Sequence, residues 1–384
     1  MRILFRATFS VLILCVAAAA DDVRVIVGFK GQPDAEVVRK LGGGQMRNLL
    51  AGRTMVAVVP ANAVSRLRED ENVAYVEEDG IAATMAKPPG TATQPSEQTP
   101  WGVTKVNAPL TGNVGAGIKV AIIDTGVDLA HPDLGAKIVS SGYDFANDDD
   151  DATDDHWHGT HVAGIAAADT DNAVGIAGVA RDCRILPVKV TDANGDGYYS
   201  WIIDGIIWAT DQGADVINLS LGGDVPDSFL EDACTYAHDH GVVIAAASGN
   251  DGGSVLYPAA YDDTVLAAAA SDYNDAIASF SNFGPEVDVA APGVWVLGPA
   301  PQAYVGPDEL PYVFASGTSA AAPHVAGLAA LIRSIKPDLT AGEIMMIVRY
   351  TADDIDRTAF PGRDDHAGYG RINMRRAIVP YILD

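Results

Sequence analysis

Cysteine is scarce in this chain of 384 residues, occurring only at Cys15, Cys183 and Cys234, so at most one disulfide can form within it. Basic residues are also few: 25 Lys and Arg stand against 51 Asp and Glu, which gives a formal net charge of -26. A chain this acidic is a poor ligand, through charge, for nucleic acid or an anionic membrane. We therefore expect neither class of partner.

Long apolar segments are absent except at the N-terminus. Residues 1–20 combine a basic start at Arg2 and Arg6, an apolar run, and the small residues Ala18 and Ala20, which is the pattern of a signal peptide. A membrane anchor is the alternative, but the apolar run is short for a spanning helix and ends in small residues. We expect a secreted, extracellular, monomeric protein without membrane attachment once the signal is removed.

Only Cys183 and Cys234 remain after removal of that signal. Export would allow them to form a disulfide. Cys183 leads into an apolar, strand-like run, however, and Cys234 lies in a helical pattern, so two separately buried thiols are an equal alternative. The sequence leaves both possibilities open.

The negative charge is confined to one part of the chain. Residues 1–85 carry 10 basic and 10 acidic side chains, whereas residues 86–384 carry the whole excess, with 36 Asp and only 5 Glu. Repulsion alone does not favour Asp over Glu, so the bias needs a separate explanation. The apolar fraction of 48% is sufficient for a sizeable core and argues against global disorder.

Residues 21–85 have the pattern of a small α+β domain. Apolar periodicity and turn residues predict the order β-α-β-β-α-β, a split βαβ or ferredoxin-like arrangement. The predicted strands are 23–29, 45–50, 54–59 and 73–76, and the predicted helices are 33–41 and 61–69. Residues 86–98 follow as a Pro-, Thr- and Gln-rich segment without periodicity, which we interpret as an exposed linker.

Strands and helices alternate through residues 99–384. Apolar runs predict strands at 118–123, 185–190, 216–219, 242–247 and 265–269, with helices between them at 161–168, 200–211 and 229–240. This alternation predicts an α/β fold with a mostly parallel sheet flanked by helices. Functional residues of such a fold gather at the carboxyl ends of strands and at helix N-termini.

Three short segments could carry chemistry. Asp124 ends a predicted strand, His158 lies within His156–Gly164, and Ser319 begins an Ala-rich helical run. A serine hydroxyl needs a base to become a nucleophile, and the base needs a carboxylate to hold one tautomer. The oxyanion needs preorganised donors, and Asn250 at the end of another predicted strand could supply one.

Each of these features has a simpler explanation when it is taken alone. A carboxylate after a strand often caps a helix, and a serine at a helix start is commonly an N-cap. His156, His158 and His161 stand beside many acids and could bind zinc. The prediction of a catalytic site therefore depends on the acid, the imidazole and the hydroxyl occurring together.

Together these segments resemble the active-site signatures of the subtilisin-like serine proteases (the subtilase family, peptidase S8), in the family's order Asp, His, Ser. The resemblance covers nearly all of residues 99–378 and includes SLGG at 220–223, YP at 257–258, SFSNFG at 279–284, AAPG at 290–293 and GYGRIN at 368–373. It implies a subtilisin-like three-layer fold. Residues 21–85 resemble the family's inhibitory propeptide of the I9 type, most clearly at VAYVEED, residues 73–79.

The resemblance assigns roles to residues of this sequence. Ser319 would be the nucleophile, His158 the general base and acid, and Asp124 the residue that orients His158. Asn250 and the Ser319 amide would form the oxyanion hole, and Leu256 would make the primary specificity pocket shallow. Two segments would pair with an extended substrate, through Gly195, Gly197, Tyr199, Ser220, Leu221 and Gly222.

The implied activity is hydrolysis of peptide bonds in proteins and peptides through an acyl-enzyme, with broad specificity. The alternative is a catalytically inactive binding protein of the same fold. Residues 82–85 align with the family's propeptide end, so we expect self-cleavage between Met85 and Ala86 and acceptance of apolar residues before the cut. Residues 21–85 would then be an intramolecular chaperone and inhibitor; a permanent N-terminal domain is the alternative.

Calcium would explain part of the Asp bias, because hard cations prefer clustered oxygens. The family's strongest calcium site corresponds here to Asp133, the Asn172 side chain and three carbonyl groups, those of Thr170, Val174 and Ile176, with Glu97 or Gln98 closing it. A second candidate is the acidic segment Asp144–Asp155, in which Asp148 and Asp150 belong to a run of four adjacent carboxylates that repel one another. A solvated acidic loop is the alternative for that run.

Overall fold

The computed structural model describes residues 22–85, 87–91, 97–108, 115–305, 311–355 and 361–382. The expected signal peptide and Ala86 lie outside these residues. The chain divides into two units, one formed by Met1–Asn48 and Arg53–Glu78, the other by Leu49–Gly52 and Asp79–Asp384. The expected boundary after residue 85 therefore differs from the structural one, because Asp79–Met85 belong with the larger unit.

The smaller unit is a four-stranded antiparallel sheet in the order β2-β3-β1-β4 with two short helices. Apolar side chains from the strands and from both helices form its core. Asp34 caps the first helix by accepting a hydrogen bond from the Glu36 amide. The predicted order β-α-β-β-α-β is present, as β1 Asp22–Phe29, α1 Ala35–Lys40, β2 Gly44–Asn48, β3 Thr54–Pro60, α2 Val64–Arg68 after the 3-10 turn Ala61–Ala63, and β4 Val73–Glu78.

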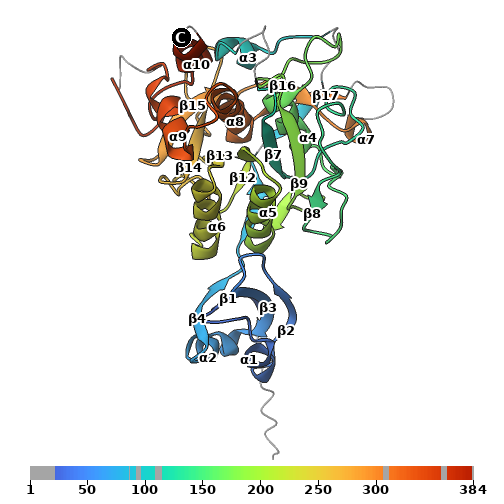
Figure 1. The fold of residues 1–384 in the computed structure, drawn as a ribbon, viewed down its shortest axis with the longest axis vertical. Coiled ribbons are helices and arrows are strands. Elements are labelled where there is room, and N and C mark those ends of the chain that lie inside the picture. Colours follow the sequence, from blue (N-terminus) through green and yellow to red (C-terminus); the bar gives the residue numbers. More distant parts are fainter. Residues whose placement is uncertain are drawn as a thin grey trace, which may run out of the picture. The chain divides into compact units, whose positions relative to one another are not determined.

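The larger unit is built on a seven-stranded sheet in the order β15-β14-β13-β11-β7-β9-β8 (Figure 1), and every adjacent pair in it is parallel. Strand β11 lies between β7 and β13, and its residues are fully buried, as parallel strands covered on both faces require. The predicted α/β fold is thus confirmed. Its strands are β7 Lys119–Asp124, β8 Tyr143–Asp144, β9 Arg184–Lys189, β11 Val216–Leu219, β13 Val243–Ala247, β14 Val265–Ser271 and β15 Val287–Pro292.

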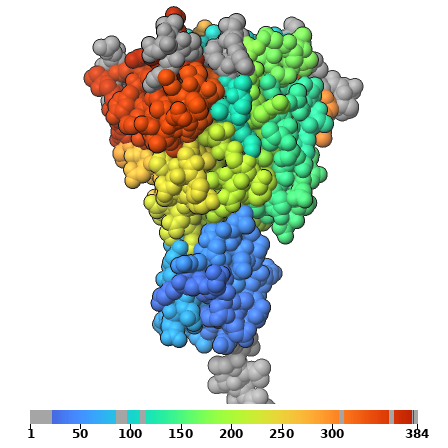
Figure 2. Space-filling model, in the orientation of Figure 1, coloured from blue at the N-terminus to red at the C-terminus, as the bar shows by residue number. Residues whose placement is uncertain are grey.

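Helices flank this sheet. The long helix α8 packs against α4 and against β11, β13, β14 and β15, while α5 and α6 form a second packed pair. Figure 2 shows the surfaces of α6 and α9, which are in contact, adjoining on the face in view. The helices are α3 Trp101–Lys105, α4 His158–Ala167, α5 Tyr199–Asp211, α6 Ser228–Asp239, α7 Gln302–Val305, α8 Thr318–Ile335, α9 Ala341–Tyr350 and α10 Met374–Ile382.

Two three-stranded sheets lie beside the main sheet. In one, β5 Ile81–Thr84 lies between β10 Asp196–Tyr198 and β12 Leu221–Gly222. In the other, β17 lies between β16 and β6, whose bounds are Tyr312–Ser316, Val296–Pro299 and Lys87–Thr91.

The strand β6 corrects one prediction. Residues 86–98 were expected to be a linker without secondary structure, yet Lys87–Thr91 pair with β17. The two prolines in this segment argued against a strand, because proline lacks the backbone N–H group that a central strand needs. At the edge of a sheet that loss is tolerated, and the partner strand lies more than two hundred residues away in sequence.

No helix among the described residues has the length and apolar character needed to cross a membrane. Both described cysteines are buried free thiols, so the open question about Cys183 and Cys234 is answered against a disulfide. Burial raises the pKa of each thiol well above its ordinary value, which makes them unreactive core groups.

Candidate active site

Three chain segments bring an acid, an imidazole and a hydroxyl to the carboxyl ends of the parallel strands. Asp124 is the last residue of β7, His158 the first of α4, and Ser319 the second of α8. All three side chains are buried. The carboxyl end of a central strand and the N-termini of two helices are the positions at which an α/β fold assembles a site.

Asp124 and His158 are in direct contact. His158 Nδ1 lies 2.7 Å from Asp124 Oδ1, which also accepts a hydrogen bond from the Thr125 amide at 2.8 Å. His158 Nε2 has no hydrogen-bond partner among the described residues. The carboxylate therefore fixes the imidazole by Nδ1 and leaves Nε2 available for proton transfer.

Ser319 and Asn250 meet at a carbonyl group of the chain itself. Asn250 Nδ2 donates to the Met85 carbonyl oxygen at 2.5 Å, and Ser319 Oγ also donates to that oxygen. Asn250 Oδ1 accepts from the Thr318 amide at 2.9 Å, which fixes the orientation of the amide group. The Met85 carbonyl thus lies where the carbonyl of a bound substrate would be polarised.

Glycine is required beside this carbonyl. A β-carbon on Gly317 would lie 2.3 Å from the Met85 oxygen and 3.0 Å from both Asn250 Nδ2 and Ser319 Oγ. The absence of a side chain at this position therefore lets the peptide carbonyl approach the hydroxyl and the amide.

The residues before Met85 are held as an extended strand. β5 pairs antiparallel with both β10 and β12, the Thr84 amide donates to Gly195 O at 3.0 Å, and the Met85 amide donates to Ser220 O at 3.2 Å. The sequence-predicted pairing segments are thus both brought against one peptide. They contain Gly195, Gly197, Ser220, Leu221 and Gly222.

Tyr199 lies beside the start of β5. Its amide donates to Gly80 O at 2.8 Å, and its hydroxyl donates to Val225 O at 2.8 Å. The ring is fully buried, and burial raises the pKa of the phenol. Within β5, Ala82 is buried between the exposed Ile81 and Ala83, and Met85, which follows the strand, is buried as well.

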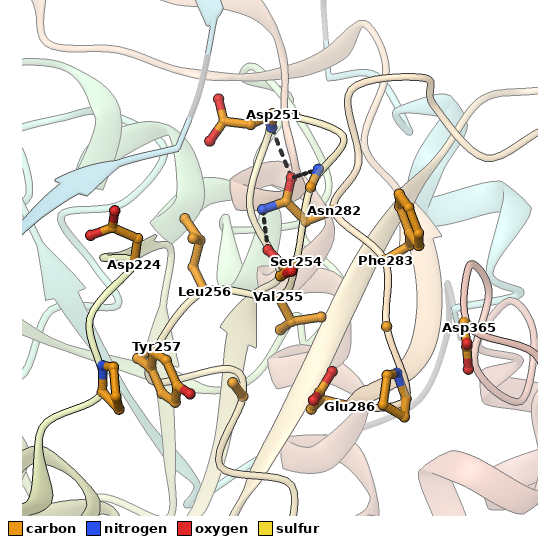
Figure 3. A pocket seen from close by; sticks show the side chains of 15 residues that line it. Asp224, Asp251, Ser254, Val255, Leu256, Tyr257, Asn282, Phe283, Glu286 and Asp365 are labelled. Carbon is orange, nitrogen blue, oxygen red and sulfur yellow. Dashed lines mark hydrogen bonds between the residues drawn. The ribbon is translucent and has the colours of Figure 1, made fainter.

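The Met85 side chain lies against Gly222. A β-carbon on Gly222 would come within 2.2 Å of Met85 Cε and 3.3 Å of Leu256 Cβ, so the thioether and Leu256 meet at this glycine. Leu256 also borders a cavity of about 640 Å³ (Figure 3), whose acidic lining residues are Asp224, Asp251, Glu286 and Asp365. Leu256 therefore touches both the Met85 pocket and the acidic cavity.

Asp154 is a site residue that the sequence reasoning missed. Its buried carboxylate accepts hydrogen bonds from Thr125 Oγ1 at 2.8 Å, from the Thr160 amide at 3.0 Å and hydroxyl at 2.6 Å, and from the His156 amide at 2.9 Å. Thr125 Oγ1 in turn accepts from the Gly159 amide at 2.9 Å. Asp154 therefore ties the residue after Asp124 to the first turn of the His158 helix.

Burial raises the pKa of Asp154 to about 6, although the hydrogen bonds to its carboxylate act to lower it. In the sequence, Asp154 lies four residues before His158, which could have indicated a role beside the site. Asp154 was instead assigned to the acidic segment.

Lys189 is a buried basic residue that also contacts Thr125. Its Nζ donates to Asp155 Oδ1 at 2.7 Å, to Thr191 O at 2.8 Å and to Thr125 O at 3.2 Å.

The other histidines near the site are neutral packing groups. His161 Nε2 lies 3.2 Å from Val296 O, and burial lowers the pKa of this imidazole to about 3. His324 Nδ1 lies 2.8 Å from Ala320 O, and burial lowers its pKa to about 4. No cluster of three or more metal-ligating side chains occurs in the described ranges, so the geometry does not favour zinc at His156, His158 and His161.

The loop 169–176 wraps around Asp133, the carboxylate that was expected to bind calcium. Asp133 is fully buried, Asn172 Nδ2 donates to its Oδ1 at 3.0 Å, and the Ile176 amide donates to its Oδ2 at 2.9 Å. Burial raises the Asp133 pKa to about 6. A β-carbon on Gly175 would lie 2.3 Å from Asp133 Oδ2, so the backbone approaches the carboxylate closely.

Three carbonyl oxygen atoms of this loop were expected to be calcium ligands. Within the described residues, the carbonyl groups expected as ligands accept no hydrogen bond; they belong to Thr170, Val174 and Ile176. Glu97 was expected to be a ligand that completes the calcium site. In the structure its carboxylate instead accepts hydrogen bonds from the Asp171 amide at 2.6 Å and the Ala173 amide at 3.1 Å. Gln98 lies beside the loop and pairs with Gly175 through its backbone.

The second candidate site has less support. Asp148 Oδ1 accepts a hydrogen bond from the Tyr143 hydroxyl at 2.7 Å, and Asp148 and Asp150 are both exposed. Asp149 and Asp151 each accept a hydrogen bond from the backbone amide two residues ahead. This run therefore has the features of a loop of self-capping turns, and calcium at Asp148 and Asp150 stays a prediction of the sequence.

Comparisons with known proteins identify the family of the chain. The model of the subtilase family matches residues 115–370. The chain is 37% identical over 376 residues to subtilisin NAT of Bacillus subtilis subsp. natto, covering 94% of this chain and 91% of that protein. It is 42% identical over 280 residues to thermitase of Thermoactinomyces vulgaris, covering 72% of this chain and 95% of that protein.

Two longer proteins match as well. A thermophilic serine proteinase from Bacillus sp. strain AK1 is 47% identical over 279 residues, and the match spans 73% of this chain but 64% of that protein. The structure of fervidolysin from Fervidobacterium pennivorans, a keratinolytic enzyme related to subtilisin, superimposes with a TM-score of 0.80 at 28% identity over 94% of this chain and 61% of that one. On the evidence of fold, site geometry and these matches, the chain belongs to the subtilase family of serine peptidases.

Proposed function

We propose that this chain is a secreted serine endopeptidase that cleaves its own precursor and then other proteins and peptides. The observation that carries the proposal is the Met85 carbonyl oxygen, which lies against both Ser319 Oγ and Asn250 Nδ2 while β5 is held between β10 and β12. This contact supports the proposal, because a substrate peptide would be expected to occupy the same position.

The reaction would follow from this geometry. Ser319 Oγ attacks the carbonyl carbon before the cut, and its proton passes to His158 Nε2, while Asp124 stabilises the imidazolium through Nδ1. Asn250 Nδ2, together with the Ser319 amide, stabilises the oxyanion. Collapse breaks the C–N bond, and His158 gives its proton to the leaving amine. Water, deprotonated by His158, then hydrolyses the acyl-enzyme and restores Ser319.

Maturation is part of the same proposal. Cleavage between Met85 and Ala86 would separate residues 21–85, which would act as inhibitor and folding aid, and the signal peptide at residues 1–20 would already have been removed. The buried position of the Met85 side chain against Gly222 supports an apolar preference before the cut. We propose calcium as a structural cofactor at Asp133, Asn172 and the carbonyls of residues 170, 174 and 176, where it would cross-link Asp133 to the loop 169–176.

N-terminal sequencing of the wild type and of Ser319→Ala tests the proposal. We expect the wild type to begin at Ala86 and the variant to remain joined at Met85. Labelling by an organophosphorus reagent should be stoichiometric in the wild type and absent in the variant. Equal processing in both proteins would refute self-cleavage, and an unlabelled, intact wild type would favour the inactive binding protein.

A further inference from the structure

Pro323 deprives the backbone of Ser319 of a helical hydrogen bond. In an α-helix the carbonyl of each residue accepts from the N–H four residues ahead. For Ser319, the second residue of α8, that residue is Pro323. Proline has no backbone N–H, and its ring crowds the carbonyl four residues before it. The Ser319 carbonyl therefore needs a donor from outside the helix, because buried carbonyls are seldom left unpaired.

Ser220 supplies that donor from the segment between β11 and β12. Its hydroxyl donates to Ser319 O at 2.9 Å, and both residues are buried. The carbonyl oxygen of Ser220 accepts from the Met85 amide at 3.2 Å. Ser220 therefore contacts the backbone of the residue before the proposed cut through one group and the backbone of Ser319 through another.

Asn218 fixes the direction of the Ser220 hydroxyl. Asn218 Nδ2 donates to Ser220 Oγ at 2.9 Å. A hydroxyl has one proton to donate and two lone pairs that accept, so its proton remains directed at Ser319 O while its oxygen accepts from Asn218. The backbone of Asn218 is held on both sides, since β11 pairs with β7 at Ile122 and with β13 at Ala245.

The Asn218 amide is unfavourable for stability in this position. The residue is fully buried in a central strand, and among the described residues its Oδ1 has no hydrogen-bond partner. A buried acceptor without a partner destabilises the fold, and an apolar side chain would occupy the same space without that penalty. A polar group kept in a core under these conditions indicates a role other than stability.

We infer that Ser220 and Asn218 are positioning residues for the nucleophile. The Ser220 hydroxyl replaces the hydrogen bond that Pro323 cannot donate, and Asn218 orients this hydroxyl. Together they hold the peptide plane that follows Ser319, which sets the direction of the Ser319 side chain. The inference rests on the proposed function and adds to it a link between the strand that pairs with the peptide and the nucleophile.

Steady-state kinetics of Ser220→Ala tests the inference on GIAATM, residues 80–85, carrying a chromogenic amine. We expect kcat to fall about tenfold, because a misplacement of about 1 Å can lower a rate about a hundredfold and the loss of one hydrogen bond causes a smaller shift. KM should change by less than about twofold, since the Ser220 carbonyl that pairs with the peptide remains. Organophosphorus labelling gives the concentration of active sites. An unchanged kcat would overturn the inference.

Pro323→Ala provides the most specific comparison. It restores an N–H at position 323, which can donate to Ser319 O within the helix. In this background Ser220→Ala should lower kcat by less than about threefold, against about tenfold in the parent, whatever Pro323→Ala does by itself. Equal losses in the two backgrounds would refute the inference.

Asn218→Ala tests the second positioning residue. It should lower kcat in the parent and have no further effect in Ser220→Ala, because the hydroxyl that Asn218 orients is then absent. Losses that multiply in the double variant would contradict the role of Asn218.

Ser271→Ala is the matched control, because it removes a buried serine hydroxyl that has no hydrogen-bond partner within the described ranges. Its kcat should stay within about twofold of the parent. An equal loss in Ser271→Ala and Ser220→Ala would trace the effect to buried volume and refute the inference. Failure of the wild type to cleave the peptide would refute the peptidase assignment, whereas cleavage that Ser220→Ala leaves unchanged would refute only the positioning role.

Discussion

Thr125 donates a hydrogen bond from its hydroxyl to the buried carboxylate of Asp154 at 2.8 Å, next to the contact between Asp124 and His158. This bond connects the end of β7 with the loop that precedes α4. The relative position of Asp124 and His158 therefore depends on a carboxylate that touches neither residue.

Asp154→Asn should lower kcat about tenfold to a hundredfold and change KM by less than about twofold, because the amide places a donor where the Thr160 amide and hydroxyl already donate. Steady-state kinetics on a short chromogenic peptide measures the effect. Asp151→Asn, at an exposed acid of the same loop, is the control. An unchanged kcat in a folded Asp154→Asn protein would show that this carboxylate does not position the site.

The buried histidines predict how stability depends on pH. Folding lowers the pKa of His161 to about 3 and of His324 to about 4, from an ordinary value of 6.5. At these two histidines the unfolded chain therefore binds more protons below pH 6.5, and their contribution to the free energy of unfolding should fall as the pH decreases, by up to about 1.4 kcal/mol per unit for each histidine. Asp133 and Asp154, whose pKa folding raises to about 6, contribute the opposite slope between about pH 4 and 6.

Urea unfolding of the Ser319→Ala protein between pH 5 and 7 measures this slope without self-digestion. His324→Gln should flatten the slope by about half of the histidine contribution, whatever its effect at neutral pH. His238→Gln, at a partly exposed position, is the matched control substitution. A slope that is the same in His324→Gln and in the parent would contradict the assignment.

Calcium removal should lower the melting temperature. If calcium joins Asp133 to the loop 169–176, saturating calcium at a hundredfold its dissociation constant would add about 2.7 kcal/mol to the free energy of unfolding, a shift of about 3–4 °C in a chain of this size. Scanning calorimetry of the Ser319→Ala protein in calcium and in EDTA measures the shift.

Two matched variants locate the metal. Asp133→Asn should abolish the difference between calcium and EDTA, whereas Asp150→Asn should retain it. The opposite result would place calcium in the acidic run 148–151. An identical melting temperature in calcium and EDTA for the parent protein would exclude a stabilising calcium ion.

Leu256→Gly should broaden the preference for the residue before the cut. Removing this side chain, which meets Met85 at Gly222 and borders the acidic cavity, would deepen the pocket. We expect the ratio of kcat/KM for Phe over Met at that position to rise about tenfold, since pocket space for a few carbons contributes about 1–3 kcal/mol. Val255→Ala is the control, and an unchanged ratio in Leu256→Gly would show that Leu256 does not limit the pocket.

Much of the fold follows from local sequence patterns. The buried runs at β7, β9, β11, β13 and β14 were predicted within about two residues, because a strand covered on both faces needs a continuous apolar run. Asp124, His158 and Ser319 were assigned by their resemblance to the family's signature motifs. Each follows or begins an element whose periodicity is strong, and the fold brings those ends together.

Features that depend on contacts between distant segments could not be predicted. Lys87–Thr91 became a strand only because they pair with β17, and proline-rich sequence gave no local sign of it. Asp154 was assigned to an acidic run with a calcium role, since the sequence does not show that its carboxylate is buried under Thr125 and Thr160.

The sequence by itself determined the α/β fold, the family, and the identity of the residues that could form a site, because these depend on periodicity and on short motifs. The tertiary structure decided which groups touch: that Asn250 and Ser319 meet at the Met85 carbonyl, that Cys183 and Cys234 remain apart as thiols, and that Glu97 binds backbone amides of the loop beside Asp133. Hydrogen bonds and burial depend on distances of a few ångströms between segments far apart in sequence, and only the packed chain fixes those distances.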